Sequence, residues 1–221
     1  MSQWSVAKRH LAAVTAALML INFTAAGAET APPTGGVETG GEKIVFFRHG
    51  EKPSGGLGQL DCQGLNRALK LPEVLKNKFG KPKVIFAPDP RDKVEDDHTE
   101  YYYVRPLATI EPTAIKFGMP VNTDYGFSQI GELQKELLNS KHSTDLIFVI
   151  WEHKKLIELV KNIVEKGGGS SGSVPDWPSD DYDTILVLHV THETGGLKVK
   201  LDKPEAEGLT KGLSTECPNP K

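Results

Sequence analysis

KIVFFRHGE, residues 43–51, joins an apolar run to a group of polar side chains. Its first part, residues 43–47, is β-branched and aromatic, which is typical of a strand buried on both faces. Such strands occur in sheets that are covered by helices on both sides. The arginine, histidine, glycine and glutamate that follow are therefore expected at one edge of a sheet, just where the strand ends.

The rest of the chain repeats this alternation of buried strands and helical patterns. Residues 83–87 (KVIFA) and 145–150 (DLIFVI) predict two more buried strands. Further elements are expected as strands over 184–190 and 197–201 and as helices over 63–78, 106–117, 129–139 and 154–166. Alternating strands and helices predict an α/β fold: a three-layer sandwich with a mainly parallel central sheet flanked by helices.

The predicted helix over 63–78 has one apolar face and an internal proline. Pro72 is expected to kink or split it, and Pro112 to interrupt the helix that starts at Pro106, because proline removes a backbone donor. The face expected to be buried consists of Leu65, Ala68, Leu69 and Leu75. The longer connections are expected to be loops, over residues 52–62, 88–104 and 167–181.

Residues 1–28 have the three-part pattern of a secretory signal peptide. Lys8 and Arg9 precede an uncharged apolar run over 11–23, and small residues follow at 26–28. A membrane anchor is the alternative, but the run is shorter than the roughly 20 apolar residues of a membrane span. We therefore expect cleavage of the signal and a periplasmic or secreted protein.

Composition limits what the remaining chain can be. Residues 29–42 are rich in Pro, Gly and Thr and are expected to be a flexible leader, and residues 43–221 form one domain. Hydrophobic residues make up 38% and charged residues 25% of the sequence, which excludes a polytopic membrane protein and a mostly disordered chain. The net charge of −3 gives no indication of nucleic-acid binding.

Cys62 and Cys217 are the two cysteines of the chain. Two are too few for a disulfide scaffold or a four-cysteine zinc site. In an oxidising compartment they could form a disulfide that ties the C-terminal tail to the domain. Two unpaired thiols are the alternative, and export favours the pairing.

Polar residues follow two of the predicted buried strands. Arg48 and His49 end the first, and His153 comes shortly after the strand over 145–150. Arg105 lies at the start of a predicted helix. Because open α/β sheets bind ligands outside the carboxyl ends of their strands, we expect these four side chains to converge at one edge.

This group of residue types suits phosphate chemistry. Guanidinium groups match phosphate oxygens and stay charged, and a helix N-terminus near Arg105 would add backbone donors for the same anion. A neutral imidazole can attack phosphorus, and nearby arginines disfavour the imidazolium form. Gly50 would let the backbone turn sharply and leave space beside the attacked phosphate.

Three segments, in order, resemble the histidine phosphatase superfamily, also called the phosphoglycerate-mutase-like fold. Residues 46–51 (FFRHGE) resemble its RHG motif. Residues 105–114 (RPLATIEPTA) resemble the segment that carries its second phosphate-binding arginine, and residues 151–153 (WEH) fall where its second histidine follows a late strand. The order and strand context of these segments agree over residues 43–201.

The resemblance implies a role for each matching residue. His49 would be the nucleophile that becomes phosphorylated. Arg48, Arg105 and His153 would bind the phosphoryl group, and His153 would also stabilise its charge in the transition state. The resemblance implies no metal and no cofactor, since the arginines supply the positive charge that a metal would otherwise provide.

The general acid that protonates the leaving group is not evident in the sequence. One branch of the family places an aspartate directly after the second histidine, where this chain has Lys154. Adjacent residues on a strand point to opposite faces, which weakens the residue before that histidine as a candidate. The open candidates are Glu132, Asp124, Glu152 and Glu51, or no acid at all.

These observations predict an exported phosphatase that hydrolyses phosphomonoesters through a phosphohistidine on His49. Its partner would be a small phosphorylated substrate or a phosphoprotein, with no nucleic acid and, after signal cleavage, no membrane. The alternative is a non-catalytic or weakly catalytic protein that binds a phosphorylated ligand in the same pocket. A metal-dependent hydrolase is a third hypothesis.

Several side chains also allow simpler interpretations. Arg105 could form a surface ion pair with the acidic residues 95–97, and His153 could be a buried histidine with its hydrogen bonds satisfied. The tyrosines at 101–103 could line the pocket or cover the core. His189, His192 and Glu193 could suggest a metal site, but their spacing favours the end of a strand.

Overall fold

The structure is a computed structural model, and it describes residues 41–218. The predicted signal peptide and residues 29–40 of the predicted leader lie outside the described residues. Within residues 41–218, every helix is too short or too polar to cross a membrane.

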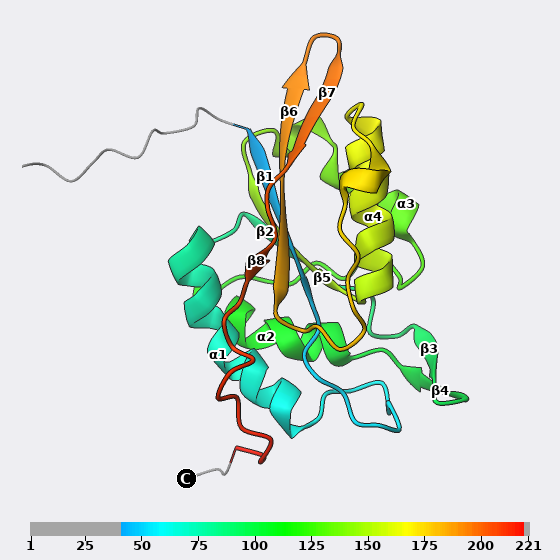
Figure 1. Ribbon diagram of the computed structural model, residues 1–221, viewed down its shortest axis with the longest axis vertical. Helices are drawn as coiled ribbons and strands as arrows, with labels where there is room; N and C mark the ends of the chain where they lie inside the picture. The colour runs from blue at the N-terminus through cyan, green and yellow to red at the C-terminus, as the bar shows by residue number, and fades with distance from the viewer. Residues whose placement is uncertain (1–40, 219–221) are drawn as a thin grey trace, which may run out of the picture. The chain divides into compact units, whose positions relative to one another are not determined.

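The central strand of the main sheet is β1 (Glu42–Arg48), the run that the sequence places first (Figure 1). The strand order is β2-β5-β1-β6-β7, with β8 paired to β6. The other strands are β2 (Val84–Phe86), β5 (Leu146–Trp151), β6 (Thr184–Glu193), β7 (Gly196–Leu201) and β8 (Glu205–Ala206). β2, β5 and β1 are parallel, as expected, whereas β6 runs antiparallel to β1 and to its hairpin partner β7.

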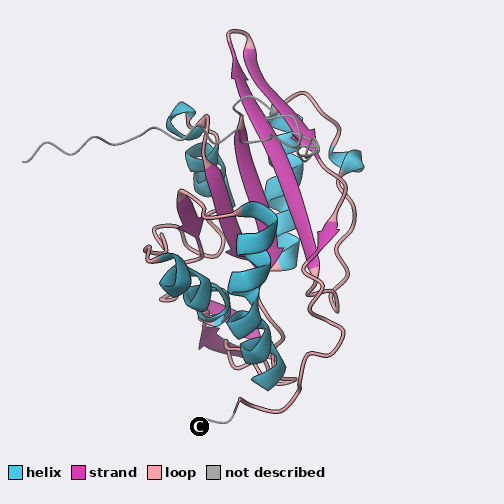
Figure 2. Cartoon of the chain, turned by 90° about the vertical axis from the view of Figure 1, so that its left-hand side faces the viewer, coloured by secondary structure: helices cyan, strands magenta, loops and turns pink. Residues whose placement is uncertain are grey.

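Helices cover both faces of this sheet and make three layers. Alternate residues of β1 serve the two cores: Ile44 and Phe46 pack into one cluster and Val45 and Phe47 into the other. Figure 2 shows helices in front of the strands and behind them. One face is covered by α1 (Cys62–Phe79) and α2 (Arg105–Phe117), the other by α3 (Ile130–Leu137) and α4 (His153–Lys166). The predicted α/β sandwich is confirmed.

The prolines do not end the helices that contain them. Pro72 lies within the 18-residue α1 and Pro112 within the 13-residue α2. Each proline removes one helical hydrogen bond, but both helices keep buried residues on either side of it, and Pro72 is itself buried. Packing on the sheet therefore outweighs the local cost, and the expected split and break are wrong.

The buried face of α1 differs from the predicted one. Leu65 and Leu69 are 38% and 52% exposed, whereas Arg67 is fully buried and Leu71 packs against the sheet. The true buried face follows the helical spacing 64, 67, 68, 71 and 75. Because this face includes Gly64 and Arg67, a pattern of apolar residues alone does not predict it.

Residues 88–104 are not a simple loop, because they contain a β-hairpin. β3 (Lys93–Asp96) pairs with β4 (Thr99–Tyr102) in a separate two-stranded sheet. Its turn residues Asp97 and His98 have φ of 51° and 62°, the pair of positive φ values that a type I′ hairpin turn requires. Charged side chains on both strands obscure the hairpin in the sequence.

Two glycines bring α1 into direct contact with the polar end of β1. A Cβ atom on Gly64 would lie 2.3 Å from the carbonyl oxygen of Glu51, and one on Gly50 would lie 2.9 Å from Cα of Gly64. This backbone contact therefore requires glycine at position 50.

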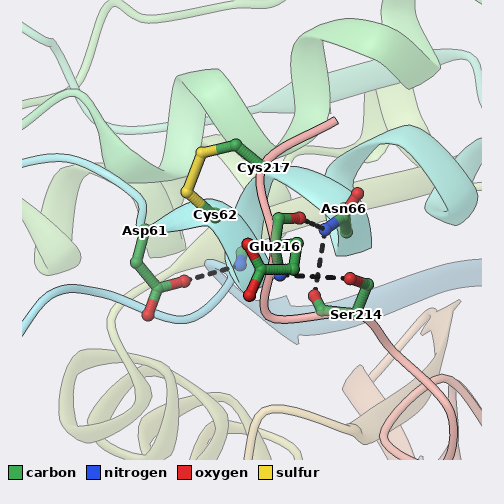
Figure 3. Close-up of a disulfide and its surroundings, with 7 residues drawn as sticks. Asp61, Cys62, Asn66, Ser214, Glu216 and Cys217 are labelled. Atoms are coloured by element: carbon green, nitrogen blue, oxygen red, sulfur yellow. Dashed lines mark hydrogen bonds between the residues drawn. A yellow bond between two sulfur atoms is a disulfide. The ribbon is translucent and has the colours of Figure 1, made fainter. Parts of the chain in front are cut away.

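The C-terminal tail is fastened to the start of α1. Cys62 and Cys217 form a disulfide with their Cα atoms 4.5 Å apart, as the sequence predicts for an oxidising compartment (Figure 3). Beside it, Nδ2 of Asn66 donates to the carbonyl oxygens of Ser214 and Glu216 at 2.9 and 2.7 Å. One covalent bond and two hydrogen bonds thus hold the tail against the first turns of α1.

Arg67 forms a second, buried connection to the tail. Its guanidinium donates to both oxygens of Glu51, at 2.9 and 2.7 Å, to Glu207 at 2.5 Å and to Asp183 at 3.3 Å. Burial raises the pKa of Glu207, and the charge and hydrogen bond of Arg67 oppose this shift. The network joins the loop after β1, α1 and the segments before β6 and after β8, and no local sequence pattern indicates it.

We expect Gly64→Ala to lower the free energy of unfolding by about 1–3 kcal/mol, because the new methyl group would overlap the Glu51 carbonyl. Gly131→Ala, also inside a helix, would meet no atom within 4 Å and is expected to raise it by up to about 1 kcal/mol. Urea unfolding of the oxidised protein measures both. Equal stability of the two variants would contradict the close contact.

Candidate active site

The carboxyl ends of β1 and β5 meet at one edge of the sheet. The parallel register places Arg48 opposite Trp151, and the N–H of His49 donates to the Trp151 carbonyl at 3.1 Å. His153 begins α4 two residues later. Arg48, His49, Arg105 and His153 all line one cavity of about 670 Å³. The structure thus confirms that these four residues converge.

His49 is 1% exposed and is held in a defined tautomer. Its Nδ1 lies 2.7 Å from the carbonyl oxygen of Gly50. A carbonyl can only accept, so Nδ1 carries the proton and Nε2 keeps its lone pair. Burial, and after it the charge of Arg105, lowers the pKa of His49 to about 3. The ring is therefore a neutral imidazole with one nitrogen ready to act as a nucleophile.

Thr109, one turn into α2, holds the loop that carries His49. Its Oγ1 accepts the N–H of Gly50 at 2.9 Å and donates to the carbonyl of Arg105 at 2.8 Å. This buried threonine lies within the segment that resembles the family, but no role for it followed from the sequence.

Arg48 is buried against the loop that precedes β6. Its NH1 donates to the carbonyl oxygens of Ser179 and Asp181 at 2.7 and 2.9 Å. The guanidinium carbon lies 3.8 Å from the centre of the Tyr182 ring, a cation–π contact. Its Nε is buried without a hydrogen-bond partner. Tyr182 also lines the cavity and was missed, because its loop gives no local signal.

Arg105 is 4% exposed and is paired with Asp96 of the β3–β4 hairpin. The ion pair considered from the sequence therefore exists, but it is buried in the cavity wall rather than on the surface. At the start of α2, the N–H groups of Val104 and Arg105 both donate to the carbonyl of Gly58, so these two are not donors to an anion. Nε of Arg105 is buried and unpaired.

Glu152 and His153 act as a pair at the start of α4. Glu152 caps the helix by accepting the N–H of Lys155 at 3.0 Å. Its Oε1 lies 2.7 Å from Nδ1 of His153. Burial would raise the pKa of Glu152, but His153 and the backbone donors outweigh it and lower the value to about 2. Glu152 is therefore an ionised group directly beside the ring of His153.

The structure narrows the choice of general acid. Asp124 and Glu132 are exposed and do not line the cavity, and both oxygens of Glu51 bind Arg67. Glu152 does line it: the strand ends at Trp151, so the alternation of faces does not apply. The cavity has three further carboxylates that the sequence analysis did not consider as acids: Glu95, Asp96 and Glu158.

The structure also places the tyrosines at 101–103 and the two histidines of β6. Tyr103 is 1% exposed and lines the cavity, so it belongs to both the core and the pocket, whereas Tyr102 is 59% exposed. His189 contacts Asp202 and His192 contacts Glu42. Residues 41–218 contain no group of three or more His, Cys, Asp or Glu placed to hold a metal ion.

We expect the imidazole of His49 to remain neutral, with its proton on Nδ1, at pH 5. A free histidine has a pKa of about 6.5, and burial lowers this one to about 3. Below about pH 6.5, His49 is protonated in the unfolded chain but stays neutral in the folded chain. The free energy of unfolding therefore decreases as the pH falls through this range. Nitrogen NMR of labelled histidine, assigned by loss of the signal in His49→Gln, measures the state. A doubly protonated ring at pH 5 would contradict the assignment.

Comparison with known proteins matches the fold. No protein-family model and no curated protein sequence matches the chain. A mycobacterial glucosyl-3-phosphoglycerate phosphatase with inorganic phosphate is similar in structure (TM-score 0.52, 14% identity, 73% of this chain and 96% of that one). So is a structure assigned to phosphohistidine phosphatase SixA from Agrobacterium tumefaciens (TM-score 0.50, 10% identity, 75% and 98%). Both are members of one superfamily. The chain therefore has the fold of the histidine phosphatase superfamily.

Proposed function

We propose that this protein is a phosphatase that hydrolyses phosphomonoesters through a phosphohistidine intermediate on His49. The observation that carries the proposal is the tautomer of His49. Its bare Nε2 belongs to a neutral, buried ring that lines a cavity shared with two arginines. A nucleophile held neutral beside fixed positive charge is what attack on a phosphate dianion requires.

The reaction would proceed in two steps. Nε2 of His49 attacks the phosphorus, the bond to the ester oxygen breaks, and that oxygen leaves with the bonding electrons and takes a proton from solvent to become the alcohol. Water then attacks the phosphorus of phosphohistidine, the P–N bond breaks, its electrons return to Nε2, and the proton lost by the water passes to the phosphate product or to solvent. Arg48 and Arg105 would hold the non-bridging oxygens through both steps, because positioning and charge supply most of the catalysis in phosphoryl transfer.

His153 would complete the phosphate site. The Glu152 carboxylate lies 2.7 Å from Nδ1 of His153, so Nε2 is the ring nitrogen that would face a phosphoryl group. Charge developing on the transferred phosphoryl group would be stabilised from that side. Glu152 is thus a positioning residue, which explains why a carboxylate lies beside an anion-binding site.

The proposed substrates have leaving groups that need little protonation. Cationic or backbone donors hold Asp96 and Glu152 ionised, and Glu158 pairs with Lys155. Aryl phosphates and the phosphoramidates of phosphoproteins fit such a site, as do other activated phosphates. The two similar structures are assigned to a glucosyl-3-phosphoglycerate phosphatase and to a phosphohistidine phosphatase, so the names on this fold include both a phosphomonoester and a phosphoramidate substrate.

Two further parts of the proposal concern export and the alternative function. A disulfide together with the sequence of residues 1–28 supports an exported protein, since disulfides persist in oxidising compartments.

The shortage of a protonated acid supports the second candidate, a protein that binds a phosphorylated ligand with little or no turnover. Phosphate release that depends on His49 separates the two functions.

We expect purified residues 29–221 to release phosphate from an aryl phosphate in the presence of EDTA. His49→Ala should reduce the rate by more than about a thousandfold, because the covalent step loses its nucleophile. His189→Gln, at the opposite end of the sheet from the cavity, is the matched control and should keep full activity. Activity retained in His49→Ala would contradict the phosphohistidine step, and loss in EDTA would indicate a metal-dependent hydrolase.

We expect turnover to depend strongly on the leaving group. A general acid contributes about 10²- to 10⁴-fold, so an alkyl phosphate should react slower than a nitrophenyl phosphate by at least that factor. Rates for a series of aryl and alkyl phosphates, compared at one pH, measure the dependence. Equal rates across the series would show that a side chain of the cavity does supply the proton.

A further inference from the structure

We propose that Asp96 is a resident anion that competes with the phosphoryl group of the substrate for Arg105 and thereby sets the affinity of the site for phosphate. The inference rests on the proposed function, because it assumes that phosphate binds at Arg105. It adds a residue that the resemblance to a family does not include.

The contacts of Asp96 place it directly on the proposed phosphate site. This side chain is 7% exposed, and its Oδ2 accepts from NH1 of Arg105. Its Oδ1 lies 2.5 Å from Nζ of Lys52. All three residues line the same cavity as His49. Arg105 therefore already has an anionic partner when no phosphate is bound.

The backbone at Gly56 leaves space for the carboxylate of Asp96. Gly56 has φ of 72°, and a Cβ atom there would lie 2.1 Å from Cγ of Asp96. The carbonyl of Gly56 also accepts from NH1 of Arg105, at 3.3 Å. A larger residue at position 56 would thus overlap the carboxylate, so the loop between β1 and α1 is built around the ion pair.

The hairpin brings Asp96, and not its neighbour Glu95, into contact with Arg105. Glu95 and Asp96 are adjacent on β3 and point to opposite faces. The side chain of Glu95 is 72% exposed and lies 3.8 Å from His98, whereas Asp96 is buried. The turn at Asp97 and His98 fixes this arrangement through two residues with positive φ.

Competition follows from the charges and favours a role in binding rather than proton donation. The hydrogen bonds from Lys52 and Arg105 outweigh burial and lower the pKa of Asp96, so it remains an anion. A phosphate dianion that binds Arg105 must displace this carboxylate or lie beside it and be repelled. In both cases Asp96 weakens the binding of phosphate to Arg105, either because the ion pair must first separate or because the two anions repel each other.

The test measures binding of inorganic phosphate by calorimetry, separately from turnover. We expect Asp96→Asn to bind phosphate about tenfold more tightly, the factor that one charge-assisted hydrogen bond supplies. Glu95→Gln removes a negative charge from the same cavity wall without altering the partner of Arg105, and its affinity should change by less than about twofold. Equal tightening in both variants would show a general charge effect and overturn the proposal.

Gly56→Ala tests placement without changing a charge. Its methyl group would push Asp96 off Arg105, so phosphate affinity should rise as in Asp96→Asn, whereas Gly55→Ala meets no atom within 4 Å and should leave it unchanged. Unchanged affinity in both Gly56→Ala and Asp96→Asn would overturn the inference. His49-dependent turnover would then still support the proposed function. Tighter phosphate binding by Asp96→Asn without any turnover would overturn the catalytic proposal alone.

Discussion

Parallel hydrogen bonding between β1 and β5 is the constraint on which the rest of the site depends. It sets Arg48 beside Trp151 and so brings the two following histidines to the same edge of the sheet. The Gly50–Gly64 contact then lets α1 close directly over the end of β1. A shift of one residue in this register would move Arg48 to the other face and separate the two histidines.

The two arginines of the cavity are held in different ways, and this difference organises its electrostatics. Arg48 is held by backbone carbonyls and an aromatic ring and has no direct contact with a carboxylate of residues 41–218. Arg105 is held by the carboxylate of Asp96. The cavity thus has one arginine in an ion pair and one without such a partner in the described part of the chain, next to a histidine kept neutral by burial.

The sequence alone predicts those parts of the fold and of the site that follow from a local pattern of residues. The apolar runs predict the buried strands, and the polar residues at their ends predict the four convergent side chains. Asp96 and Tyr182 could not be predicted as cavity residues, because only the folded hairpin and the loop before β6 bring them there. Arg67 is a buried charge that no local pattern predicts, since its carboxylate partners Glu51, Asp183 and Glu207 come from three distant segments.

The disulfide separates a covalently closed ring from the N-terminal segment that contains β1, and this affects how the sheet can form. Cys62 and Cys217 close a covalent ring that contains β5 and β6, while β1 and His49 precede the ring. The central strand must therefore be inserted between two strands that are both made about a hundred or more residues later. A single cut in the connection 52–61 would leave the ring as one piece and turn the strand that carries His49 into a separate peptide, held only by noncovalent contacts: the sheet, the Glu51–Arg67 ion pair and the hydrogen bonds of Arg48 and Gly50.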